Sequence, residues 1–368
     1  MFSMFFHNKF SKKKVIVTGH TGFKGSWLTA WLQLLGANVF GLSCDIPSKP
    51  SHFVAAKLAK GMSDIRVDLR DKVLTKKKFL QIQPDFVFHL AAQPLVSIAY
   101  KKPTVTWQTN VLGTLNVLEA LRGLKKKCVA VIITSDKCYN NREIKRGYNE
   151  DDVLGGKDPY SASKAAAEIL IRSHIISFFS KKNTKVRIAS ARAGNVIGGG
   201  DWSSDRVIPD CVRSWSKNKI VKIRNPKSTR PWQHVLEAAS GYLSLASFLH
   251  DKQKFHGEPF NFGPYEKKNH SVLDLVKEMS KYWPDVKWND LSKNKPQFRE
   301  SQLLKLNCKK AYQNLKWKAV LNFGEMVEFV SVWYRSYYEK NKDIKKLTFN
   351  QIKEYQKIAQ KKGLRWAK

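Results

Sequence analysis

The stretch VIVTGHTGFKGSWLTAWLQLLG, residues 15–36, decides the fold. It begins with a short apolar run, passes through a turn with glycines at positions 19, 22 and 25, and ends in a helical pattern that stops at Gly36. Glycines there permit a tight turn, close approach of backbone N–H groups to a pyrophosphate, and close packing of helix on strand. The helix N-terminus also favours negative charge. The stretch predicts a dinucleotide-binding strand, turn and helix; the alternative is a glycine-rich turn without a ligand.

A second apolar strand, NVFGLSCD (38–45), ends at Asp45 and completes a strand–helix–strand unit. Asp45 stands twenty residues beyond Gly25. An acidic residue at this point holds the ribose diol of the cofactor, so the sequence favours NAD over NADP. Asp68, in IRVDLRD, is expected either at the adenine edge of the cofactor or as an ordinary turn aspartate.

Further apolar runs at 85–92 and 128–135 alternate with helical patterns, of which 110–124 is the clearest. This alternation predicts an α/β fold, a Rossmann-type doubly wound parallel sheet covered by helices on both faces. After residue 190 the chain is less regular: 191–202 is rich in glycine and 224–235 holds two prolines. A strand over 260–264 and a helix over 270–283 that begins with a serine cap follow. We expect a smaller mixed C-terminal region.

The expected division of the chain has three parts. Residues 12–194 form the NAD-binding domain, and 235–265 return to it. Residues 195–234 and 266–340 bind the substrate. Residues 341–368 form a basic C-terminal helix and tail, which we expect to be a solvated surface helix.

The charge balance is strongly basic, with 66 Lys and Arg against 30 Asp and Glu in 368 residues. The basic residues are spread along the chain, which favours a solvated lysine-rich surface over a dedicated nucleic-acid face. The five cysteines form no C-x-x-C pair, so we expect free thiols and no metal site. Because there is no secretory signal and no long apolar run, we expect a cytoplasmic protein.

The segment YSASK places Tyr160 and Lys164 four residues apart, on one face of a helix. The ammonium of Lys164 can then lower the pKa of the Tyr160 hydroxyl from about 10 toward neutrality. A tyrosinate made in this way is a general base for an alcohol while hydride leaves the carbon. By itself such a pair is more often a surface contact, but together with the glycine turn it indicates a dehydrogenase-type site.

The segment TSDKCY (134–139) follows an apolar strand, so its side chains are expected in the crevice beyond the carboxyl ends of the sheet. Asp136 and Lys137 place an acid and a base side by side. Elimination of water next to a ketone needs one group to remove a proton and another to protonate the departing hydroxyl. Standing alone, the two would be read as ordinary loop charges.

These motifs together resemble the extended short-chain dehydrogenase/reductases that act on nucleotide sugars. The resemblance runs from about Lys14 to Tyr355 and is carried by VTGHTGFKGSWL, FHLAAQPLV, TNVLGT, TSDKCY, DPYSASK, RAGNVIGGGDW, RPWQHV and LTFNQIKEY. Nucleotide-sugar epimerases of the family are similar in the glycine turn and Y-x-x-x-K but lack the acid–base pair. In the similar dTDP-glucose dehydratases the pair is Asp-Glu; Asp136-Lys137 departs from that pattern and matches the CDP-sugar branch.

The resemblance implies a lyase that dehydrates CDP-glucose to its 4-keto-6-deoxy product with NAD kept bound, supplying dideoxysugars for surface polysaccharide such as the lipopolysaccharide O-antigen. Tyr160, with Lys164 and Ser135 beside it, takes the proton of the C4 hydroxyl. Lys137 stands where the family has a glutamate and removes the C5 proton, while Asp136 protonates the C6 hydroxyl. Lys137 accepts a proton only in its neutral form. The nearby charge of Lys164 favours this form and that of Asp136 opposes it, so a different residue as the C5 base remains an alternative.

The resemblance also assigns binding residues. The family's NAD positions correspond to Gly19, Thr21, Gly22, Phe23, Lys24, Gly25, Asp45, Asp68, Leu69, Leu90, Ala91, Ala92, Thr109, Tyr160 and Lys164. The nucleotide-sugar positions correspond to Asn195, Arg206, Arg230 and His234. Arginine suits a diphosphate through bidentate hydrogen bonds, although surface salt bridges are an alternative for both arginines. The family implies a homodimer or a dimer of dimers, through a four-helix contact of segments near 105–124 and 160–180.

Two other classes of function stay open from the sequence. One is a nucleotide-sugar 4-epimerase, or a 4,6-dehydratase for another nucleotide sugar. The other is a non-catalytic nucleic-acid-binding protein on a Rossmann scaffold, which the formal charge of +36 motivates.

Overall fold

A seven-stranded parallel sheet carries the fold in the computed structural model, which describes residues 5–180, 184–223, 225–264, 270–283, 286–290, 303–339 and 342–368. The strands lie in the order β11-β6-β5-β4-β1-β2-β3, and all neighbours are parallel. Their bounds are β1 Lys14–Thr18, β2 Asn38–Ser43, β3 Ser63–Arg66, β4 Phe86–His89, β5 Cys128–Ile133, β6 Val186–Ala193 and β11 Pro259–Phe262. The expected doubly wound sheet is confirmed.

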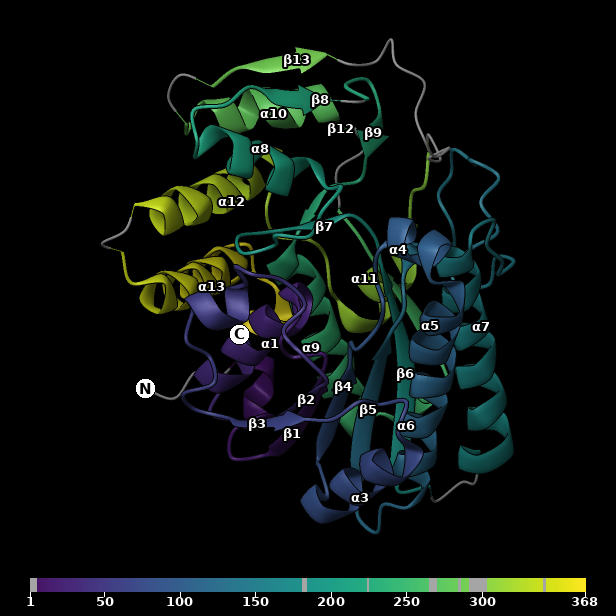
Figure 1. The fold of residues 1–368 in the computed structure, drawn as a ribbon. Helices are drawn as coiled ribbons and strands as arrows, with labels where there is room; N and C mark the ends of the chain where they lie inside the picture. The colour runs from purple at the N-terminus through teal and green to yellow at the C-terminus, as the bar shows by residue number, and fades with distance from the viewer. Residues whose placement is uncertain are drawn as a thin grey trace.

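Helices cover both faces of this sheet (Figure 1). Alternate residues of β1 face opposite layers, since Val15 and Val17 join one apolar cluster and Ile16 the other. One layer holds α1 Phe23–Leu34, α2 His52–Ala55, α9 Val235–Asp251, α11 Lys309–Leu315 and α13 Ile344–Lys361. The other holds α3 Lys72–Ile82, α4 Val96–Lys101, α5 Pro103–Trp107, η2 Gln108–Leu112, α6 Gly113–Arg122, α7 Pro159–His174 and η4 Ile175–Phe179. Burial on both faces explains why the strand sequences are continuously apolar.

The C-terminal helix α13 is not the solvated surface helix expected from its lysines. Its apolar face is buried against α1, where Tyr355 and Trp366 pack around Trp31. The Tyr355 hydroxyl also donates to the buried carboxylate of Glu237 on α9, at 2.6 Å. The lysines occupy the outer face only, so this segment is part of the core layer.

The remaining elements lie beyond the carboxyl ends of the strands, at the top of Figure 1. They are β7 Val196–Ile197, α8 Val207–Trp215, β8 Val221–Ile223, β9 Thr229–Arg230, β10 Gln233–His234, β12 His270–Ser271, α10 Val272–Ser280, β13 Trp288–Asp290 and α12 Phe323–Tyr338. The predicted serine cap is confirmed, because Ser271 and Asp274 form a reciprocal capping box at the start of α10. Among the described residues, none of the helices is both long and apolar enough to cross a membrane.

Candidate active site at the carboxyl ends of the strands

The glycine turn joins β1 to α1 as predicted. Gly19 has a φ of +71°, and a Cβ there would lie 2.8 Å from the Ala91 backbone. A Cβ on Gly25 would lie 2.1 Å from the carbonyl oxygen of Gly19, so neither position accepts a side chain. Gly22 caps α1, which leaves the first backbone N–H groups of the helix without intrahelical partners. This cradle fits the pyrophosphate of a dinucleotide, which would accept hydrogen bonds from those groups.

Asp45 lies two residues beyond the end of β2, with an exposed side chain. Its backbone carbonyl accepts a hydrogen bond from the Thr21 hydroxyl at 2.6 Å, which ties the end of β2 to the glycine turn. The carboxylate therefore stands beside the turn, where the ribose of a bound dinucleotide would lie.

The Asp68 carboxylate accepts hydrogen bonds from Arg70 at both oxygens, from Nε to Oδ1 at 3.0 Å and from Nη2 to Oδ2 at 2.5 Å. These hydrogen bonds lower the pKa of the Asp68 carboxyl. Of the two readings of the sequence, this geometry favours the ordinary turn aspartate. The next residue, Leu69, is buried in the apolar cluster under α6.

The other predicted cofactor residues line the ends of β4 and η2. Leu90, Ala91 and Ala92 follow β4 and are half-buried, and Ala91 touches the turn at Gly19. Thr109 is half-buried in η2. Its neighbour Asn110 was not singled out by the sequence, yet its amide accepts from Gln93 N and donates to Ser163 Oγ, at 2.8 and 2.9 Å. Asn110 therefore fixes α7 relative to the end of β4.

Tyr160 and Lys164 occupy successive turns of α7, as predicted, and both are buried. The Asp158 carboxylate caps this helix by accepting from the backbone N–H of Tyr160 at 3.0 Å. The Ser135 side chain lies close enough to the Tyr160 hydroxyl to lower its pKa, and the short helix that begins at Asp136 packs against α7. The expected lowering of the tyrosine pKa is not found: burial raises the pKa of Tyr160 to about 12, against the effect of Ser135.

Asp136 begins the short helix η3 Asp136–Cys138 and has 3% of its surface exposed. Its Oδ1 accepts from Ser135 Oγ at 2.9 Å. Burial raises the pKa of this carboxyl, although Lys137, Ser135 and Lys24 act in the opposite direction. The backbone of Gly194 lies so close that a Cβ there would be 2.0 Å from the Asp136 Oδ2. Asp136 is therefore a buried carboxyl group whose pKa lies above its usual value.

Lys24, which the resemblance assigned to the NAD site, also brings a charged side chain to this group of residues. Burial lowers the pKa of Lys24 to about 8, Arg206 adds to the lowering, and Asp136 opposes it. Burial likewise lowers the pKa of Lys164 to about 7, and the charge of Lys24 contributes. The crevice thus gathers lysine and arginine side chains around one carboxyl, which suits an anionic substrate.

The four residues predicted to bind the substrate are not equivalent. Arg206 pairs with Asp201 at 2.8 Å, and its charge acts on Tyr160 and Lys24, so it faces the catalytic groups. Asn195 precedes β7 and Arg230 lies in β9, both half-buried beyond the sheet.

His234 is completely buried, between Trp27 and Phe329. Its Nδ1 accepts from the backbone N–H of Leu236 at 3.3 Å, which caps α9. Burial lowers the pKa of His234 to about 3, so the ring is neutral. The contact of His234 with the substrate stays a prediction: the ring is buried at the start of α9, where it lines a small cavity together with Arg230.

Two further residues near the site were missed. Glu168 follows Lys164 by one helical turn, and Arg192 lies on β6; they form a buried ion pair of 2.8 Å. The spacing Y-x-x-x-K-x-x-x-E could have pointed to Glu168, because all three residues share a helix face. No local signal could have found Arg192.

The amino-acid sequence is similar to those of known nucleotide-sugar dehydratases and epimerases. The family model described as GDP-mannose 4,6 dehydratase matches residues 16–330. A CDP-glucose 4,6-dehydratase from Salmonella typhimurium is 44% identical over 336 residues, which cover 89% of this chain and 93% of the relative. A UDP-glucose 4-epimerase from Mycoplasma genitalium is 23% identical over 89% of this chain and 98% of its own.

The fold is also that of solved structures. The crystal structure of a UDP-glucuronic acid 4-epimerase from Bacillus cereus, in complex with UDP-glucuronic acid and NAD, matches with a TM-score of 0.73 at 23% identity. The match covers 88% of this chain and 99% of that one.

Proposed function

The chain belongs to the GDP-mannose 4,6-dehydratase family, and we propose that it is an NAD-dependent hydro-lyase that converts CDP-glucose to CDP-4-keto-6-deoxyglucose. The choice of nucleotide is supported by the relative named CDP-glucose 4,6-dehydratase, which matches over most of both chains. The type of reaction is supported by the Asp136–Lys137 pair beside Tyr160.

The observation that carries the proposal is the position of the Asp136 carboxyl, which is buried beside Ser135 and whose pKa burial raises. It lies at the end of β5, and Ser135 contacts both this carboxyl and the Tyr160 hydroxyl. Dehydration needs an acid for the leaving hydroxyl in addition to a base for the alcohol, and the two are joined here through one serine.

The oxidation step uses the α7 residues. The Tyr160 phenolate, stabilised by the nearby Ser135 hydroxyl, takes the proton of the C4 hydroxyl and becomes the neutral phenol. The glycine turn would hold NAD, which would supply the hydride acceptor for C4 and the hydride donor for C6, and its positively charged ring would favour the phenolate form of Tyr160. With a pKa of about 7, Lys164 is partly charged near neutral pH, and its charged form favours the phenolate as well.

The elimination step uses the two residues after Ser135. The C4 ketone acidifies the C5 proton, which Lys137 accepts while the electron pair forms the C5–C6 double bond. The C6–O bond breaks, and Asp136 gives its proton to the leaving hydroxyl, which departs as water. The hydride returns to C6 and the proton of Lys137 returns to C5, and transfer of a proton from Tyr160 to Asp136 restores both groups.

We propose that Asp45 selects NAD through the ribose hydroxyls, since a 2′-phosphate would lie against its exposed carboxylate. Asp45→Asn is expected to raise the KM for NAD and to reduce discrimination against NADP. Asp71→Asn, at the cap of α3, is the matched control and leaves the ratio unchanged. Equal discrimination in all three proteins would contradict this role.

The division of labour along the chain remains our proposal: 12–194 with 235–265 for NAD, and 195–234 with 266–340 for the nucleotide sugar. The pairing of β11 with β6 supports the return of 235–265 to the sheet. The charge of Arg206 near Tyr160 supports a diphosphate position in the second part. Within these ranges and the C-terminal part, residues 181–183, 224, 265–269, 284–285, 291–302 and 340–341 lie outside the described residues. We place the enzyme in the cytoplasm, whose reducing conditions suit its five unpaired cysteines.

We further propose that two copies associate through the outer faces of α6 and α7, which lie side by side in Figure 1. This surface exposes large apolar side chains, among them Leu112, Ile169, Ile176 and Phe178. Ile169→Lys is expected to give a monomer in sedimentation velocity. Val54→Lys, an exposed apolar position on α2, is the matched control and leaves the dimer intact. A dimer that survives Ile169→Lys contradicts this interface.

The test of the proposed function is incubation of the purified protein with CDP-glucose, with and without added NAD. The 4-keto-6-deoxy product is followed by its absorbance in alkali, with dTDP-glucose, UDP-glucose and GDP-mannose in parallel. Product from CDP-glucose supports the proposal. Product from a different nucleotide sugar would overturn the substrate, and no product from any would overturn the reaction.

A further inference from the structure

One buried ion pair contacts both ends of the catalytic loop, which we define as Thr134 to Tyr139. At the start of the loop, the Thr134 hydroxyl donates to Glu168 Oε1. At its end, Arg192 Nη1 donates to the Tyr139 hydroxyl at 2.8 Å. Ser135, Asp136 and Lys137 lie between these two attachments, so their position depends on where Glu168 and Arg192 stand.

The pair itself is well ordered by its surroundings. Arg192 Nη2 and Glu168 Oε2 are 2.8 Å apart, and each side chain is only 4% exposed. Burial alone would raise the pKa of the Glu168 carboxyl, but Arg192 and the hydroxyls of Thr134 and Ser190 hold it below its usual range. Glu168 therefore stays charged and keeps its four hydrogen-bond acceptor sites directed at these partners.

The helix geometry connects this pair to the catalytic tyrosine. Tyr160, Lys164 and Glu168 are spaced by four residues on α7 and share one face. The loop contacts the first of them through Ser135 and is hydrogen-bonded to the last through Thr134. Two contacts, two helical turns apart, fix both the distance of the loop from α7 and its direction along the helix.

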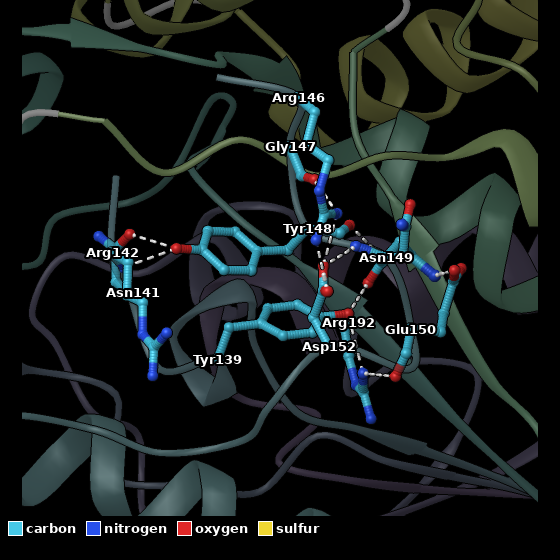
Figure 2. Close-up of polar contacts among 11 residues, drawn as sticks. Tyr139, Asn141, Arg142, Arg146, Gly147, Tyr148, Asn149, Glu150, Asp152 and Arg192 are labelled. Carbon is cyan, nitrogen blue, oxygen red and sulfur yellow. Dashed lines mark hydrogen bonds and ion pairs between the residues drawn. The ribbon is translucent and has the colours of Figure 1, made fainter. Parts of the chain in front are cut away.

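Arg192 and the end of the loop are also held by residues other than Glu168 (Figure 2). Arg192 Nη1 also donates to the carbonyl of Glu150 at 2.8 Å, and its guanidinium lies over the Tyr139 ring at 5.0 Å. The Tyr139 hydroxyl donates to Asn261 Oδ1 on β11 at 2.7 Å. Several hydrogen bonds among Tyr139, Arg192, Glu150 and Asn261 therefore hold the end of the loop.

Stability does not account for such a pair. Removing two charges from water costs several kcal/mol, and apolar residues of the same volume often serve a core equally well or better. What an apolar contact cannot do is fix direction, whereas a carboxylate with three donors from a loop, a neighbouring strand and an arginine sets the orientation of all of them.

We propose that Glu168 and Arg192 are positioning residues that hold the Ser135-Asp136-Lys137 segment in catalytic register with Tyr160 and Lys164. The inference rests on the proposed function, since it assigns a role within that reaction. Catalytic groups must lie within about 0.5 Å of their productive positions, and a misplacement of about 1 Å costs about 100-fold in rate.

The test compares two hydroxyl deletions on the same carboxylate. Thr134→Val removes the bond that joins the loop to Glu168, and Ser190→Ala removes a bond of 2.9 Å from β6 to Glu168. Both leave the ion pair in place, and both are expected to lower Tm by a similar few degrees. Thr134→Val is expected to lower kcat by about 10- to 100-fold with KM within about threefold, whereas Ser190→Ala keeps kcat within about threefold.

Equal losses of kcat in the two variants, no loss in Thr134→Val, or a change in KM alone would each overturn the proposal. Should Thr134→Val fail to fold, Tyr139→Phe releases the other end of the loop and is judged by the same criteria. If the unaltered chain dehydrates none of the nucleotide sugars, the proposed function has failed, and crystal structures decide the positioning role. A displacement of the Asp136 backbone beyond about 0.5 Å in Thr134→Val and not in Ser190→Ala supports it; equal displacements overturn it.

Discussion

Replacement of Gly194 by alanine is a direct test of the position assigned to Asp136. Gly194 follows β6, and its backbone faces the carboxyl group that follows β5. A Cβ at this position would lie 2.0 Å from the Asp136 Oδ2 and 2.6 Å from its Cγ, whereas ordinary van der Waals contact begins at 3.4 Å. The carboxyl must therefore retreat by the difference between 2.0 and 3.4 Å, about 1.4 Å.

The size of the expected effect follows from this displacement. Asp136 is buried, and its Oδ1 accepts a hydrogen bond from Ser135. A carboxyl group that moves away from the new Cβ therefore cannot keep both this hydrogen bond and its original position. Displacement of a reacting group by about 1 Å costs about 100-fold in rate, or about 2.7 kcal/mol in activation free energy. We expect Gly194→Ala to lose about 100-fold in kcat for dehydration, with NAD binding close to that of the unaltered protein.

The assay follows the 4-keto-6-deoxy product in alkali together with Tm. Gly324→Ala is the matched control, because its nearest neighbouring atom is 3.5 Å from the new Cβ and it lies at the start of α12. Asp136→Asn removes the acid without a clash and is expected to show a comparable loss of kcat. A Gly194→Ala protein that dehydrates substrate within about threefold of the unaltered rate would refute the reasoning.

Three further predictions test other groups. Lys137→Ala is expected to abolish elimination while the bound NAD is still reduced at 340 nm, and full dehydration by this variant would exclude Lys137 as the C5 base. Burial lowers the pKa of Lys164, and the positive charge of Lys24 contributes. Lys24→Met should therefore move the limb of the kcat–pH profile that Lys164 sets to higher pH, while Lys24→Arg leaves it in place. Identical kcat–pH profiles for the two variants would contradict this. Burial raises the pKa of the Glu237 carboxyl from 4.5 to about 7. As the pH rises, the unfolded chain loses this proton before the folded chain does, so the free energy of unfolding should fall by about 3 kcal/mol between pH 4.5 and 7. Glu237→Gln should remove this loss of stability, because the Tyr355 hydroxyl can donate to Ser240 and accept from the new amide. Urea unfolding at pH 5 and pH 8 measures the free energy of unfolding of both proteins. An equal dependence on pH in the two proteins would disprove the prediction.

Local spacing was enough for the dinucleotide-binding half of the site. The turn with Gly19 and Gly25, the exposed Asp45 beyond β2, and the Tyr160–Lys164 helix face all lie where the sequence predicted them, because each depends on residues close together in the chain. The same holds for the serine cap of α10 and for the position of Asp136 at the end of β5, which follows from the rule that parallel strands present their carboxyl ends at one edge.

The sequence was a poor guide wherever burial decided the chemistry. The lysine pattern of 341–368 suggested a solvated helix, yet Tyr355 on the other face of α13 and Trp366 in the segment after it belong to the core around Trp31. The motif that contains His234 gave no sign that its ring is buried at the start of α9. Tyr160 was expected to titrate near neutrality, and desolvation raises its pKa instead.

By itself, therefore, the sequence determined the sheet, the glycine turn and the relative placement of the residues proposed to carry the reaction, since these follow from periodicity and short spacings. Tertiary structure alone decided how those residues are held and charged. Glu168 meets Arg192 across 24 residues, and Gly194 meets Asp136 across the gap between two strands. Contacts of this kind, and the loss of water that shifts the pKa values of Asp136, Lys164 and Tyr160, arise only when distant segments pack together, because desolvation is a property of the packed core and not of any one segment.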